Sequence, residues 1–185
     1  MIDLMSILDV FLLTLVCMAV YLDHKTRKIP NVLTINGILA GIVLNIGLHL
    51  YADFSLLGLG QGVFICFGGL LLAVLIGLIP FSMGGLGGGD VKLLAMIGAF
   101  KGPQFILWTM LFTAVAGGVM AIFIIINKAL SERKGITSLV ASLKKYHENI
   151  MSGVLLPKSE AMKEKIPYSF AILAGVVFAY LFLQK

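Results

Sequence analysis

The chain has 185 residues, of which 59% are hydrophobic and 12% are charged, and its mean hydropathy is +1.04. These values exclude an ordinary soluble domain, and the long unbroken apolar runs are unlike the short alternating strands of an outer-membrane barrel. The formal net charge of +5 lies mainly in loops, where membrane topology and anionic lipid explain it. We therefore expect a polytopic membrane protein that contacts lipid and no nucleic acid.

Cysteine usage and short motifs exclude several kinds of site. Cys17 and Cys66 lie within apolar runs and far from any CxxC spacing, so the chain predicts neither a disulfide framework nor a zinc site. The sequence contains no HExxH, no GxSxG nucleophile elbow and no Gly-Lys-Ser/Thr end to a Walker loop. We expect no metal and no cofactor.

Three long apolar runs open the chain. The first covers about 4–22 and is expected to be retained as a span, because Asp3 stands where a cleaved signal peptide carries lysine or arginine. The second runs from about 32 to 50. The third covers about 56–79 and is expected to stop at Pro80.

The second run carries two helix signals. Pro30, directly before it, suits the first turn of a new helix. Gly37 and Gly41 inside it have the GxxxG spacing that allows close contact between membrane helices. We expect this run to pack tightly against a neighbour.

A glycine-rich stretch, 83–92, follows the third run and ends in a carboxylate, Asp90. An ionisable group this close to lipid is costly and therefore marks a candidate functional site. Glycines before it allow close backbone approach or a positive φ. The plainer interpretation is a flexible interhelical loop closed by Asp90 as a helix N-cap.

The next apolar segment is short. Residues 91–100 would cover only about half of a roughly 30 Å hydrocarbon core before Lys101-Gly102-Pro103 breaks the run. Residues 104–126 are long enough for a full span, and a last apolar run extends from about 166 to 183.

Positive charge decides whether the short segment crosses. Of fourteen Lys and Arg, three lie in 23–31 and eight in 128–166. If both stretches are cytoplasmic, an even number of spans separates them, and the short segment counts as the fourth. We therefore expect one all-α domain over 1–185 with six transmembrane helices, the fourth short, and both termini extracytoplasmic. The basic loop 128–166 is either a solvated linker or, at 136–150, a helix on the membrane surface.

Two carboxylates, Asp23 and Asp90, lie at cytoplasmic helix ends in this arrangement. The two spans between them return the chain to the same side, so they can become neighbours. Carboxylates held close in a partly dry site tend to share one proton. One can take a proton from water while the other donates to a carbonyl oxygen, which suits peptide hydrolysis without a covalent intermediate.

Three motifs, in their order along the chain, carry a family resemblance. Gly87-Gly88-Gly89-Asp90 matches the GxGD signature of intramembrane aspartic peptidases, and Val91-Lys92-Leu93 continues it. Asp23 followed by Ile29-Pro30-Asn31 precedes this motif, and Pro167-Tyr168 follows it near the last span. The chain closely resembles the type IV prepilin peptidase family over nearly its whole length except 128–166.

The resemblance implies an aspartic endopeptidase, a hydrolase, with Asp23 and Asp90 as its catalytic dyad. Residues that shape the site would be Gly87, Gly88, Gly89, Lys92, Pro30 and Asn31. The substrate would be a type IV prepilin-like precursor, cut on the cytoplasmic side of the inner membrane after a glycine that ends its short basic leader. Larger members carry a four-cysteine domain and N-methylate their product. This chain lacks that domain and resembles the compact, peptidase-only members that serve tight-adherence or similar pili.

Two other functions stay open. The chain could be a small proton-coupled carrier that uses Asp23 and Asp90 as titrating relays, or a non-catalytic subunit of a pilus or secretion assembly. A relay would string polar residues across the bilayer, whereas these carboxylates cluster at one face. The peptidase is therefore favoured, and the oligomeric state is left open.

Overall fold

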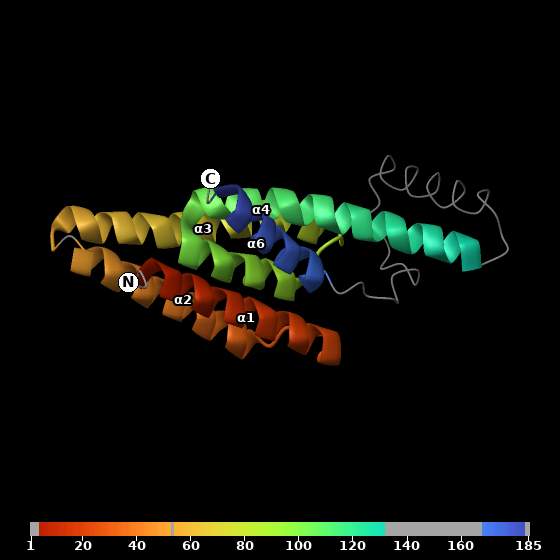
Figure 1. Cartoon of the computed structure of the whole chain (residues 1–185), viewed down its shortest axis with the longest axis horizontal. Helices are drawn as coiled ribbons and strands as arrows, with labels where there is room; N and C mark the ends of the chain where they lie inside the picture. The colour runs from red at the N-terminus through yellow and green to blue at the C-terminus, as the bar shows by residue number, and fades with distance from the viewer. Residues whose placement is uncertain (1–3, 53, 132–167, 184–185) are drawn as a thin grey trace. The chain divides into compact units, whose positions relative to one another are not determined.

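The computed structural model describes residues 4–52, 54–131 and 168–183, and within these ranges every regular element is a helix. The helices are α1 (Leu4–Thr26), α2 (Asn31–Ala52), α3 (Leu56–Ser82), α4 (Gly88–Ser131) and α6 (Ser169–Leu183) (Figure 1). The all-α prediction is confirmed for this part of the chain.

Four of these helices are long and apolar enough to cross a membrane. The candidate spans are Ile7–Thr26, Asn31–Tyr51, Leu56–Ser82 and Gly88–Ile124, and α6 is a shorter apolar helix. They support a multi-pass membrane protein. The count of six crossings and the extracytoplasmic termini stay predictions.

The chain divides into two compact units, one of 1–116 with 167–185 and one of 117–166. The core and the site described below lie in the first. The loop expected at 128–166 lies outside the described residues except for its first four, which end α4, and the surface helix expected at 136–150 lies wholly outside them.

Helix α3 runs past the proline that was expected to stop it. Pro80 lies inside the helix, which ends at Ser82. Pro80 has no N–H for the carbonyl four residues earlier, so the helix loses one hydrogen bond there and continues for only two more residues. The chain then turns through Gly84, whose φ of 75° favours glycine, and Gly85 N–H donates to the carbonyl of Pro80 at 2.9 Å.

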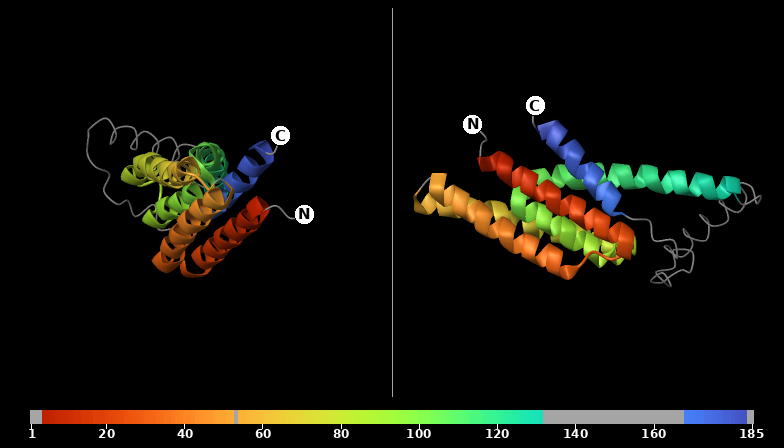
Figure 2. Two further views of the ribbon diagram at one scale, coloured as in Figure 1. Left: turned by 90° about the vertical axis from the view of Figure 1, so that its left-hand side faces the viewer. Right: turned by 60° about the horizontal axis from the view of Figure 1, so that its bottom comes forward.

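Helix α4 is two helices joined at a sharp break. Gly102 has φ 82° and ψ −177° and is followed by Pro103, so the break expected at 101–103 is confirmed. The ribbon reverses its direction there (Figures 1 and 2). Because positive φ is readily adopted only by glycine, this reversal depends on Gly102. The first half runs from Gly88 to the break and is short, as the sequence predicted.

The first half of α4, from Gly88 to the break at Gly102, forms the centre of the core and is called the central segment below. All of residues 93–100 are buried, although the segment is too short to span a bilayer alone. It packs with apolar side chains from α1 and α6: Leu8, Leu12, Val16, Ala19, Ile172, Val176 and Ala179. An apolar helix covered on every side is stabilised by protein contacts rather than by lipid.

Glycines on α2 and α3 let these helices approach the central segment closely. A Cβ at Gly37 would collide with the side chain of Met96, and one at Gly41 would lie 2.7 Å from the ring of Phe100. Gly69 on α3 meets the backbone of Gly98 directly. The close packing expected from the GxxxG spacing in α2 is confirmed. Elsewhere α2 packs on α3, and α1 packs on both α2 and α6 (Figure 2).

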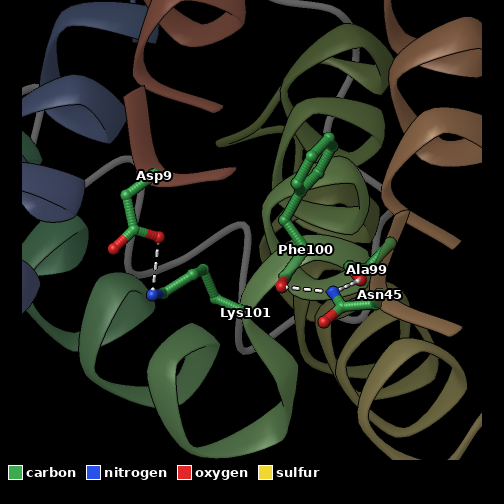
Figure 3. A network of polar contacts seen from close by, with 5 residues as sticks. All are labelled: Asp9, Asn45, Ala99, Phe100 and Lys101. Atoms are coloured by element: carbon green, nitrogen blue, oxygen red, sulfur yellow. Dashed lines mark hydrogen bonds and ion pairs between the residues drawn. The ribbon is translucent and has the colours of Figure 1, made fainter. Parts of the chain in front are cut away.

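Two polar contacts secure the end of the central segment (Figure 3). The side-chain amide of Asn45 donates to the carbonyls of Ala99 at 3.1 Å and Phe100 at 2.5 Å, and Pro103 has no N–H to offer the carbonyl of Ala99. Lys101 Nζ lies 2.8 Å from Asp9 Oδ1 on α1. These contacts hold the end of the segment at the break against α1 and α2.

Candidate active site

The structure brings Asp23, Asp90 and the start of α6 together. Asp23 lies in the last turn of α1 and Asp90 in the first turn of α4, and both are half-buried. Their carboxylates are within electrostatic range of each other. The topology predicted from the apolar runs allowed this meeting, because it places the end of α1 and the start of α4 on the same side of the membrane.

Asp90 is held by the backbone just before its own helix. Its Oδ2 accepts the N–H of Gly87 at 3.0 Å, so a first-turn carboxylate reaches back to an N–H that has no helical partner. Helix α4 therefore begins at Gly88, three residues before the expected start, and Asp90 is inside the helix rather than its N-cap. The positive end of the helix dipole faces the carboxylate.

Two of the motif glycines are in tight surroundings. A Cβ at Gly87 would lie 3.0 Å from Asp90 Oδ2, and a Cβ at Gly89 would lie 3.2 Å from Cβ of Ile29. Gly88 has more room, since the nearest atom to its Cβ would be a ring carbon of Phe81 at 3.6 Å. The stretch is thus a packed turn at Gly87 and Gly89 rather than a loose loop.

Asn31 and Lys92 join the starts of α2 and α4. Lys92 Nζ donates to Asn31 Oδ1 at 2.8 Å, and both side chains are exposed. Pro30 stands immediately before α2 rather than in its first turn, and its carbonyl accepts the N–H of Thr34 at 3.4 Å. The segment between α1 and α2 is therefore fixed to the helix that carries Asp90.

The start of α6 contacts Asp23, and Tyr168, the residue just before this helix, lies near Asp90. Ser169 is fully buried, and its Oγ donates to Asp23 Oδ2 at 2.6 Å. The phenol of Tyr168 is within electrostatic range of Asp90. Burial raises the pKa of Tyr168 above its usual value, and the charge of Asp90 raises it further, so the phenol keeps its proton at neutral pH. Phe170 meets His24 edge-on, with ring centroids 6.0 Å apart.

Ser169 is the site residue that sequence reasoning missed. It directly follows Pro167-Tyr168 at the start of the last apolar run, which the charge count places on the same side as Asp23. A hydroxyl in that position was the available signal.

Comparison with known families gives a match. The model of the type IV leader peptidase family matches residues 10–122, which include both aspartates and the glycine-rich turn. The chain belongs to the type IV leader peptidase family. No curated protein and no solved structure matches it. The resemblance seen in the sequence is confirmed, and membership makes the protein a peptidase, a hydrolase.

Two further polar residues of this leader peptidase, Asp9 and His49, bond elsewhere in the structure. Asp9 pairs with Lys101 at the far end of the central segment (Figure 3). His49 Nδ1 lies 2.9 Å from the carbonyl of Asn45, within its own helix. Asp53 lies outside the described residues. Among the described side chains, no three His, Cys, Asp or Glu gather as metal ligands would.

Proposed function

We propose that this leader peptidase is an aspartic endopeptidase of the inner membrane that removes the short leader from type IV prepilin-like precursors on the cytoplasmic side. The observation that carries the proposal is the meeting of Asp23 and Asp90, each held by a hydrogen bond from a separate part of the scaffold. The family match supports the leader peptidase class.

The chemistry follows from two carboxyl groups that share one proton. The ionised carboxylate accepts a proton from water as the water oxygen attacks the carbonyl carbon of the scissile bond. The protonated carboxyl donates to the carbonyl oxygen. When the tetrahedral intermediate collapses, the carbon–nitrogen bond breaks and the leaving amine takes a proton from the dyad. No covalent intermediate with the protein forms.

Charge around the dyad supports cleavage on the cytoplasmic side. Lys25, Arg27 and Lys28 are exposed at the end of α1, directly after Asp23. Basic residues next to a span favour the cytoplasmic face.

Cys17 and Cys66 are free and lie on different helices, with no four-cysteine cluster in the sequence. We therefore propose peptidase activity without methyl transfer.

The carrier alternative is less consistent with the core. A proton relay across the bilayer needs polar groups between its ends. Residues 93–100 separate Asp90 from the Asp9–Lys101 pair, and their side chains are apolar and buried. The central segment therefore offers no relay along its length.

Cleavage by the purified protein tests the proposal. The substrate is a precursor with a basic leader that ends in glycine before an apolar helix, and mass spectrometry identifies the new N-terminus. We expect one cut after the glycine, and none in a matched precursor in which a bulky residue replaces it. If the purified protein leaves the first precursor intact, the peptidase proposal is wrong and a non-catalytic subunit becomes the better account.

A further inference from the structure

We infer that Ser169 is a positioning residue for the dyad: its hydroxyl holds Oδ2 of Asp23, so that Oδ1 is the oxygen presented to the attacking water. This inference rests on the proposed function. It assigns a role to the start of α6, which lies outside the region that the family model matches.

The contact has the features of a built hydrogen bond. Ser169 is 0% exposed, and its Oγ lies 2.6 Å from Asp23 Oδ2. That length is typical of a hydroxyl donating to a carboxylate, which is stronger than a bond between neutral groups. Because Ser169 is fully buried, water cannot readily replace Asp23 as its partner.

The rest of α6 keeps Ser169 in place. Ile172 and Val176 are fully buried in the core, and a Cβ at Gly175 would collide with Thr113. Beside Ser169, the edge contact of Phe170 with His24 ties the same turn to the residue after Asp23. The hydroxyl is therefore presented by a helix that packs into the core, whereas Asp23 lies in the last turn of α1, where helices fray.

Asp90 is also held through one carboxylate oxygen, in this case by the glycine-rich turn before α4. Its Oδ2 accepts the N–H of Gly87, as Oδ2 of Asp23 accepts Ser169. Within the part of the chain that the structure describes, each carboxylate thus has one oxygen bonded to the scaffold, which leaves the second for the reaction. In the proposed mechanism one of these second oxygens takes a proton from water while the other donates to the carbonyl oxygen, so both must be placed correctly at once, and an error of about 1 Å can cost about a hundredfold in rate.

The kinetic test compares four full-length proteins in detergent: wild type, Ser169→Ala, Ser169→Thr and Thr109→Val. Thr109 is also fully buried, but the partner of its hydroxyl within the described residues is Phe105 of its own helix, so its variant controls for loss of a buried hydroxyl. We expect Ser169→Ala to lower kcat by about ten- to a hundredfold with little change in KM. Ser169→Thr should keep most of kcat, and Thr109→Val all of it.

A spectroscopic arm tests the hydrogen bond without relying on activity. The infrared carboxyl band of Asp23 is identified by its loss in Asp23→Asn. It should shift in Ser169→Ala and stay unchanged in Thr109→Val. An unshifted band refutes the hydrogen bond, whatever the kinetics show.

The two arms separate the possible failures. If Ser169→Ala shows a shifted band but keeps the wild-type kcat, the positioning role is refuted. It is also refuted if Ser169→Thr has a normal Tm but is as slow as Ser169→Ala. If the wild type cleaves nothing while the band shifts, the hydrogen bond stands, but the proposed function fails and the positioning role fails with it.

Discussion

Gly89 precedes Asp90, one of the two proposed catalytic carboxylates, and its lack of a side chain allows close packing there. Its neighbour is not the flexible end of a side chain but Cβ of Ile29, in the segment that joins α1 to α2. A new Cβ at 3.2 Å must displace either that segment or the first turn of α4. Asp90 is the next residue, so the displacement reaches the dyad directly.

We expect Gly89→Ala to lower kcat by up to about a hundredfold while Tm changes by only a few degrees. The matched control is Gly60→Ala on α3, where an added Cβ would meet nothing within 4 Å and alanine favours the helix. Steady-state kinetics and thermal melts of both variants decide the matter. Wild-type turnover in Gly89→Ala would mean that the glycine-rich turn is only a linker.

At the scale of the helices, the Asp9–Lys101 pair holds the end of the central segment against α1. The two side chains are 26% and 24% exposed, and Lys101 Nζ also lies 5.4 Å and 5.1 Å from the ring centroids of Phe105 and Tyr180. A half-buried charge that loses its partner is costly. The pair is about three helical turns, roughly 16 Å, from Asp90, so its effect should be on stability.

We expect Asp9→Asn and Lys101→Met each to lower the free energy of unfolding by about 1–3 kcal/mol. The double variant should lose less than the sum, because neither charge is left alone. Cleavage at a temperature where each variant is folded should stay near the wild-type rate. Additive losses in the thermal melts would show that the two residues do not interact.

The same scale shows how far the sequence predicts the helices. The apolar runs gave α1, α2 and α3 to within a few residues, and Gly102-Pro103 gave the break in α4. The end of α3 and the start of α4 were wrong, because local rules treat Pro80 and glycines as helix breakers. At α4 the bond from Gly87 to Asp90 offsets part of the poor helix propensity of Gly88 and Gly89.

At the scale of the whole molecule, the meeting of Asp23 and Asp90 was predictable because it follows from which ends of the spans share a side. The bond from Ser169 was not, because it joins residues 146 positions apart and depends on how α6 packs. Charge counting gives the sides of the spans but not the rotation of a helix about its axis.

Topology can be tested by labelling single cysteines in a variant that carries Cys17→Ser and Cys66→Ser. Cysteines introduced at Lys25 and Lys145 should react only with reagents that reach the cytoplasm, and one at Ala52 should react from outside. External labelling at position 145 would mean that the short segment does not cross, and the cytoplasmic placement of Asp90 would be wrong.

The most direct measurement of the central claim is leader cleavage by Asp23→Asn and Asp90→Asn. Asparagine keeps the size of each side chain but cannot exchange the proton, so each variant should lose at least about a hundredfold in kcat while it folds normally. Asp53→Asn and His49→Ala are the controls and should cleave at the wild-type rate. Substantial turnover in either dyad variant with a normal melt would contradict the aspartic mechanism.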